Sequence, residues 1–167
     1  DIHPRYKADV AHRLAQCALG EHYGKNVGTF RSPAYKNMVV EGDKIRINFD
    51  NVPTTLVAEG RINGFQIGVT DPNNEKKLRF CLAEAKIEGK QVVVWAEGVT
   101  APKAVRYCFN EDVGNIFSKE GLPCLPFRSD KNNSSQSARP YIEPASEIAI
   151  TFEGKKGYYV MSEFKEG

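Results

Sequence analysis

A change in hydrophobic period constrains the fold of this chain more than any other feature. From residue 35 onwards apolar residues recur at every second position, as Ile45, Ile47 and Phe49 do. This alternation is typical of strands that bury one face. It predicts strands over residues 35–41, 44–50, 56–58, 64–70, 78–87, 91–95 and 104–109.

The connections between these segments contain turn-forming residues, and Glu88, Gly89 and Lys90 form the tightest hairpin signal. Short strands that follow one another without intervening helices predict an antiparallel β-sandwich. We expect a polar loop, a long irregular segment and a mobile Ser/Asn/Gln-rich loop over 71–77, 110–130 and 131–139. A last pair of strands is expected over 147–153 and 157–162.

The first part of the chain follows a helical period instead. Pro4 suits a first helical turn, and Val10, Leu14 and Cys17 recur at helical spacing, which predicts an amphipathic helix of roughly 15 to 18 residues. Gly20 and Gly24 are its expected stop signals, and residues 24–33 read as a linker. The apolar stripe must pack on a partner, either the sandwich or an α/β domain outside this chain.

Charge and hydropathy exclude several classes of function. The 167 residues carry a formal net charge of +2, and basic residues do not cluster with aromatics, which argues against binding to nucleic acid or a membrane surface. No apolar run reaches the length of a membrane span.

The four cysteines, Cys17, Cys81, Cys108 and Cys124, are widely spaced and form no CxxC pair, so a structural zinc site is not expected. They could form two disulfides in three pairings or remain buried thiols. Buried thiols are favoured, because a core of this size needs no cross-links.

Asp1 and His3 lie two residues apart at the very start of the chain. A hydroxyl nucleophile needs a base that titrates near neutrality and a group that holds the tautomer of that base. Asp1 and His3 have a spacing that could supply both. The alternative is a surface histidine beside an aspartate that caps the helix. Because the chain opens without Met directly on this turn, we expect it to be the interior of a longer polypeptide.

Several motifs in order resemble one enzyme family. They are DIHPR at 1–5 with VAHRLA at 10–15, SPAYKNM at 32–38, GDKIRINFDNV at 42–52, RINGF at 61–65, AVRYCF at 104–109 with NIF at 115–117, and EGLP with PFRSD at 120–130. Together they resemble the sialate O-acetylesterases, which are carbohydrate esterases of the SGNH/GDSL hydrolase type. The likeness spans roughly residues 1 to 130.

The resemblance implies that residues 1–24 are the last turn and helix of a catalytic α/β hydrolase domain, and that residues 25–167 form a C-terminal β-sandwich domain. It implies hydrolysis of O-acetyl esters of sialic acid or a related sugar by serine acyl transfer, without cofactor or metal. His3 matches the catalytic base of the family.

Asp1 is either the tautomer holder or its neighbour, since the broader DxxH pattern would place the aspartate one residue earlier. The nucleophile and the oxyanion donors would lie in the absent N-terminal domain, so the chain alone is expected to be inactive. A secreted, periplasmic or lysosomal location follows from the family.

Other residues have competing interpretations. Arg106 and Arg128 could bind a sugar carboxylate bidentately, although bracing of a loop is favoured. Trp95 could be a carbohydrate platform, although a core aromatic is favoured.

His12 and His22 are expected to be helix-surface residues, and residues 71–75 a plain turn rather than a calcium loop. The competing function for the whole chain is a non-catalytic accessory module that binds glycan or supports a neighbouring domain.

Overall fold

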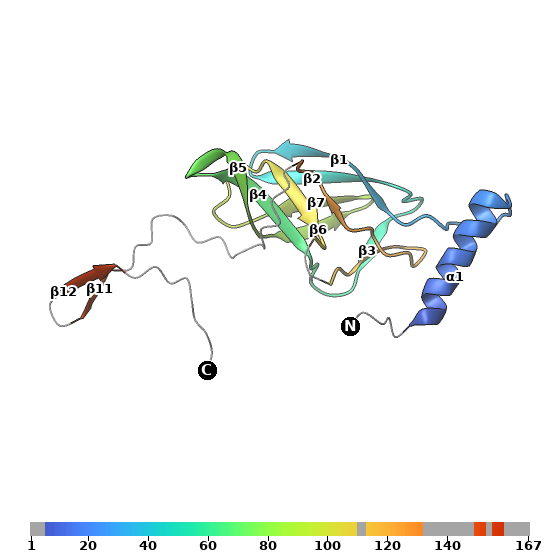
Figure 1. The fold of residues 1–167 in the computed structure, drawn as a ribbon. Helices are drawn as coiled ribbons and strands as arrows, with labels where there is room; N and C mark the ends of the chain where they lie inside the picture. The colour runs from blue at the N-terminus through green and yellow to red at the C-terminus, as the bar shows by residue number, and fades with distance from the viewer. Residues whose placement is uncertain (1–5, 110–112, 132–148, 153–154, 159–167) are drawn as a thin grey trace.

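The computed structural model describes residues 6–109, 113–131, 149–152 and 155–158. In this part of the chain, antiparallel strands dominate and one α-helix precedes them (Figure 1). The predicted fold class, a mainly β sandwich with one amphipathic helix, is therefore confirmed. The described residues contain no helix that combines the length and the apolar character needed to span a membrane.

The first sheet has four antiparallel strands in the order β1-β2-β7-β6. These are β1 Ala34–Glu41, β2 Lys44–Asp50, β7 Gln91–Trp95 and β6 Glu84–Glu88. A two-residue turn joins β1 to β2, and its Gly42 has a φ of 65°. A second such turn at Gly89, whose φ is also 65°, joins β6 to β7, so both hairpins use glycine where the backbone is left-handed.

The second sheet has the order β10-β8-β4-β5, with β4 Phe65–Asp71, β5 Asn74–Leu82, β8 Ala104–Tyr107 and β10 Phe127–Arg128. Two further pairs complete the described elements. β3 Leu56–Ala58 pairs with β9 Ile116–Ser118, and β11 Ala149–Phe152 pairs with β12 Lys155–Tyr158.

The hydrophobic core lies between the two large sheets. Alternate residues of the first sheet, such as Ile47 and Val92, are 0% exposed and join one cluster with Ile67 and Val105 of the second sheet. The intervening residues face outward, as the period of two requires. This shared core makes the two sheets a sandwich.

Three predicted segments differ in the structure. Residues 78–87 form not one strand but two, because β5 pairs with β4 in the second sheet whereas β6 pairs with β7 in the first. Ala83 lies at the crossing, and its N–H donates to the Phe65 carbonyl (3.1 Å). The polar loop predicted over 71–77 is a short turn, in which Asp71 Oδ1 accepts the Asn73 N–H (2.9 Å) and β5 begins at Asn74.

The third difference concerns residues 110–130, which were expected to be irregular. Their described part contains β9 and β10. The Cys124 N–H donates to the Ile116 carbonyl (2.9 Å), so the segment folds back on itself. Such short strands carry too few alternating residues for the hydrophobic period to reveal them. Of the last predicted strands, 147–153 and 157–162, the parts within β11 and β12 are confirmed, and the other residues lie outside the described ones.

The helix α1 spans Lys7–Cys17, 11 residues, and continues into a π-helical turn of 5 residues, Ala18–His22. It ends before Gly24, whose φ is 60°, as predicted, whereas Gly20, the other expected stop signal, lies inside the π-helical turn. None of the described residues of α1 is buried, and its apolar side chains Val10 and Leu14 are 43% and 67% exposed. The sandwich therefore does not cover the apolar stripe, which removes one of its two expected partners.

The end of the helix is held by residues that were predicted to be a linker. The ring of Phe30 packs on Gly20 so closely that a Cβ there would lie 2.7 Å from Phe30 Cδ1. Cys17 Sγ lies 3.6 Å from the Phe30 carbonyl oxygen, and Arg31 Nε pairs with Glu21 Oε1 (3.1 Å). We call these contacts, between Cys17, Gly20, Glu21, Phe30 and Arg31, the helix latch.

Gly20→Ala should open the helix latch, because the added methyl group occupies the space of the Phe30 ring. Hydrogen exchange should become faster at residues 18–31, whereas the exchange of β2 and β7 should stay unchanged. Phe30→Ala removes the ring, so adding Gly20→Ala to it should cause little further change. Equal effects of Gly20→Ala in both backgrounds would contradict the role of this contact.

Candidate functional site

The two predicted catalytic residues, Asp1 and His3, lie outside the described residues. Their roles and the boundary between residues 24 and 25 therefore stay predictions. The other two histidines, His12 and His22, are exposed on the helical segment, as expected for surface residues. His22 makes an edge contact with Tyr23, with ring centroids 4.8 Å apart.

Two serines of the β domain, Ser118 and Ser129, have structural roles. Ser118 is 0% exposed, and its Oγ accepts the Leu122 N–H (3.4 Å). Ser129 Oγ accepts the Val105 N–H (2.9 Å). Both hydroxyls stabilise backbone turns and strand ends.

Arg106 is fully buried in β8 and pairs with Asp130. Its Nε and Nη2 donate to the two oxygens of the Asp130 carboxylate at 2.9 and 2.8 Å. The guanidinium carbon also lies 3.6 Å from the centroid of the Phe80 ring and 4.2 Å from that of Phe109. A guanidinium stacked in this way and bound bidentately by a carboxylate is a bracing group, as favoured from the sequence.

Arg128 completes the same cluster from β10. Its Nε donates to the Asp130 carbonyl (3.0 Å), and its Nη2 pairs with the Asp130 carboxylate. The Ser129 N–H donates to the Val105 carbonyl (3.0 Å). These contacts therefore hold residues 127–130 against β8. In them, both guanidinium groups bind protein groups rather than a ligand.

The charges of this cluster determine the ionisation of Asp130. Burial acts to raise the pKa of its carboxyl group, but the hydrogen bonds from Arg106 and Arg128 outweigh burial and lower the pKa from 3.8 to about 2. The carboxylate thus stays ionised over the whole physiological range. Its stabilising contribution is present above about pH 4 and is lost as the pH falls toward 2.

Trp95 is not part of the hydrophobic core, which corrects the favoured interpretation. Val92 and Val94 point into the core, so Gln91 and Trp95 lie on the outer face of the first sheet. The indole is half-buried, and Lys44 Nζ lies 5.5 Å from its ring centroid.

The cysteines agree with the expectation from the sequence. All four are thiols rather than disulfides; Cys81 and Cys124 are buried, and Cys17 and Cys108 are half-buried. Burial raises the pKa of Cys124 to about 12, so this thiol is unreactive at neutral pH. Within the described ranges, His, Cys, Asp and Glu side chains do not gather in groups of three or more that could hold a metal ion.

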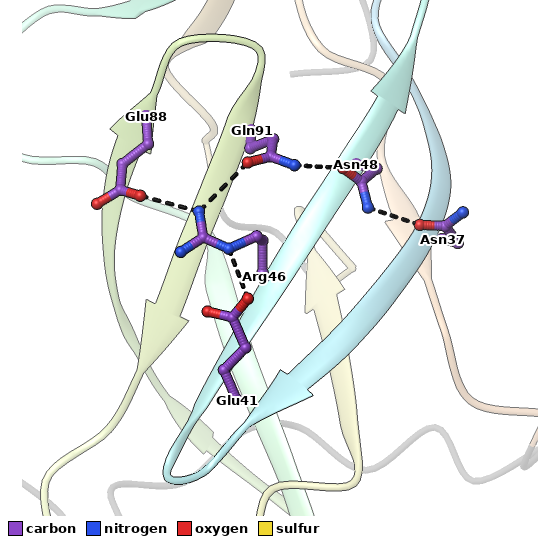
Figure 2. A network of polar contacts seen from close by, with 6 residues as sticks. All are labelled: Asn37, Glu41, Arg46, Asn48, Glu88 and Gln91. Carbon is purple, nitrogen blue, oxygen red and sulfur yellow. Dashed lines mark hydrogen bonds and ion pairs between the residues drawn. The ribbon is translucent and has the colours of Figure 1, made fainter.

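A row of polar side chains crosses the outer face of the first sheet (Figure 2). Asn48 Nδ2 donates to Asn37 Oδ1 (2.7 Å), and Gln91 Nε2 donates to Asn48 Oδ1 (2.6 Å). Arg46 Nη1 then donates to Gln91 Oε1 (3.3 Å). We call these four residues, from strands β1, β2 and β7, the amide row.

Two carboxylates fix the charged end of the amide row. Arg46 Nε donates to Glu41 Oε1 (2.7 Å), and Arg46 Nη1 donates to Glu88 Oε2 (2.8 Å) (Figure 2). The hydrogen bonds from Arg46 hold the pKa of both carboxyl groups below the usual value. The same two carboxylates raise the pKa of the guanidinium, so all three groups stay charged at neutral pH.

Sequence reasoning missed the amide row. The period of two places Arg46 and Asn48 on the outward face of β2, but polar residues are the ordinary content of such a face. The missing information was the strand order, because Asn37, Asn48 and Gln91 become neighbours only when β7 pairs with β2.

Asp130→Asn should lower the free energy of unfolding by about 3 to 5 kcal/mol at pH 7, because it leaves a buried guanidinium without its carboxylate. Asp50→Asn removes an exposed pair with Lys36 and should cost at most about 1 kcal/mol. Urea titration measures both. The difference between Asp130→Asn and the unchanged chain should shrink as the pH falls from 4 to 2; a constant difference would contradict the assignment of this ionisation.

Comparison with known proteins finds similarity among solved structures. No protein-family model matches the chain, and no curated protein matches it. Among solved structures, the chain is similar to a carbohydrate acetylesterase from Xanthomonas citri, with 36% sequence identity and a TM-score of 0.69.

This similarity covers 78% of the present chain but only 30% of the acetylesterase chain. The present chain thus spans less than a third of the length of the solved structure that it matches. The described fold therefore occurs within a carbohydrate acetylesterase, and the similarity supports a relationship to the carbohydrate esterases.

Proposed function

We propose that this chain is the C-terminal part of a serine esterase that hydrolyses O-acetyl esters on carbohydrates, of the sialate O-acetylesterase type. The observation that carries the proposal is the 36% identity over 78% of the chain with a carbohydrate acetylesterase. The ordered motifs of the sequence, from residues 1–5 to residues 120–130, support it independently. The choice of sialic acid among acetylated sugars rests on those motifs alone.

The proposed chemistry is acyl transfer in two steps. A serine hydroxyl in the N-terminal part of the longer protein attacks the acetyl carbonyl, and His3 takes its proton. His3 then gives the proton to the departing sugar oxygen as the acetyl–oxygen bond breaks. Water, deprotonated by His3, attacks the acetyl-serine and releases acetate and the free serine. Asp1, or the residue before it, holds the imidazole in the required tautomer.

The apolar face of α1 supports this proposal. Val10 and Leu14 are exposed, and the sandwich does not cover them. Burial of each such side chain is worth about 1.5 to 3 kcal/mol, so a helix with this pattern is stabilised by a packing partner. In the proposed arrangement that partner is a catalytic α/β domain that ends with this helix, and the helix latch connects the domain to the sandwich.

His3→Ala in the longer protein should lower kcat on a small acetyl ester by several orders of magnitude, because the serine loses its base. The thermal midpoint should stay nearly unchanged, since His3 is proposed to act in proton transfer rather than in packing. His12→Ala is the matched control, because His12 is an exposed histidine of the same helix; its activity should equal that of the unchanged enzyme. Retained activity of His3→Ala would show that His3 is structural only.

The 167-residue chain alone should not hydrolyse a chromogenic acetyl ester above the rate of buffer, because the proposed nucleophile lies outside it. Release of the chromophore is measured with the unchanged chain and with His3→Ala. Turnover by the unchanged chain that His3→Ala abolishes would overturn the division of the site between two parts of the protein.

A further inference from the structure

The amide row borders a hollow on the outer face of the first sheet. The hollow has a volume of about 470 Å³ and is lined by Asn37, Asn48 and Gln91 of the row, with Lys36, Glu88 and Lys90 at its rim. Ligand sites commonly occupy about 300 to 1,000 Å³, so the hollow is large enough for one or two sugar rings. Strands β1, β2, β6 and β7 and the β6–β7 turn supply its walls, so hairpins with fixed registers position its polar groups.

The amides of this hollow are fixed in orientation before any ligand binds. Asn48 donates one N–H to Asn37 and accepts one from Gln91, so its amide plane is held from both sides. Each side-chain amide has two N–H donors and two acceptor lone pairs, and the bonds within the row use only part of that capacity. The row therefore offers alternating donors and acceptors at fixed positions, and fixed groups cost little conformational entropy on binding.

The charges around the hollow nearly balance. Lys36 pairs with Asp50 (2.9 Å), Arg46 pairs with Glu41 and Glu88, and Lys86 also pairs with Glu88 (3.6 Å). With Lys90, the charged side chains of the lining and their ion-pair partners comprise four basic and three acidic groups. A phosphate or sulfate group would meet carboxylates as well as amines here, so this balance favours an uncharged ligand.

The residues that line the hollow also favour a carbohydrate over a protein partner. Protein interfaces centre on exposed aromatic or aliphatic side chains that become buried. The aromatic residue that lines this hollow, Phe49, is itself 9% exposed and belongs to the core. Hydroxyl groups, each both a donor and an acceptor, match alternating amide donors and acceptors best.

We propose that this hollow is a binding site for a neutral oligosaccharide, whose hydroxyl groups pair with the amides of Asn37, Asn48 and Gln91. In the proposed esterase the site would hold an unacetylated part of the carbohydrate chain away from the reacting ester. Binding does not require esterase activity. The two proposals can therefore fail separately, since a small acetyl ester tests the catalytic turn and does not need the hollow.

The test uses the full chain of 167 residues, isotope-labelled, and linear hexasaccharides of glucose, xylose and mannose, with a sulfated heparin hexasaccharide as the anionic counterpart. At least one neutral hexasaccharide should bind and shift the side-chain NH2 resonances of Asn37, Asn48 and Gln91. Asn48→Ala and Gln91→Ala should each weaken the affinity by about tenfold, the value of one hydrogen bond.

The matched control is Asn73→Ala, which makes the same chemical change at an exposed asparagine in the β4–β5 turn of the other sheet; its affinity should be unchanged. The resonance shifts of the unchanged chain decide the question even if a variant folds poorly. The proposal is overturned if none of the neutral hexasaccharides binds at millimolar concentration, if the shifts lie on another face, or if only the heparin fragment binds.

Discussion

The buried charge of one arginine constrains how β8 and β10 are arranged. Arg106 is fully buried in the central part of the second sheet, where an uncompensated guanidinium would cost several kcal/mol. Asp130, 24 residues later in the sequence, pairs with it, and the rings of Phe80 and Phe109 lie against it. β10 pairs with β8 beside this contact, and Ser129 Oγ accepts the Val105 N–H, so the pairing and the strand register support each other.

The pair also gives a structural role to a motif that resembles part of an enzyme family. The residues of 104–109 and 120–130 looked like a functional signature in the sequence. In the structure their arginines and aspartate satisfy one another, and Tyr107 Oη accepts the Ile116 N–H (3.1 Å) within the core. A specific sequence pattern can thus reflect the pairing of a buried charge inside the fold. The proposed chemistry lies at the other end of the chain.

Much of the fold could be predicted from the period of two, because residues such as Ile45, Ile47 and Phe49 are buried on one face whatever strand lies beside them. The bounds of β2, β3 and β7 match the predicted ones. The split of residues 78–87 could not be predicted, because apolar alternation continues through Ala83 although the hydrogen-bonding partner changes. The favoured role of Trp95 was wrong for a related reason. Whether its side chain faces the core or the outer surface depends on which alternate residues of β7 point inward.

The two candidate sites differ in how far apart their residues lie in the sequence. Asp1 and His3 are two positions apart in sequence, so a motif could reveal them, although the residues lie outside the described structure. The amide row joins Asn37 and Gln91, which are 54 positions apart, and only the register of three strands brings them together. A sequence motif can therefore reveal the first kind of site, whereas the second becomes visible only when the strand order and register are known.

The crossing at Ala83 has a mechanical consequence for the whole sandwich. Because β5 and β6 belong to different sheets and a single residue separates them, the two layers cannot move apart without breaking strand pairing on both sides. Along the sequence, β1 and β2 belong to the first sheet, β4 and β5 to the second, β6 and β7 to the first again, and β8 to the second. Neither sheet is therefore formed by one contiguous stretch of sequence. Both sheets therefore depend on pairings between residues that are distant in sequence, and we expect the sandwich to fold slowly and cooperatively.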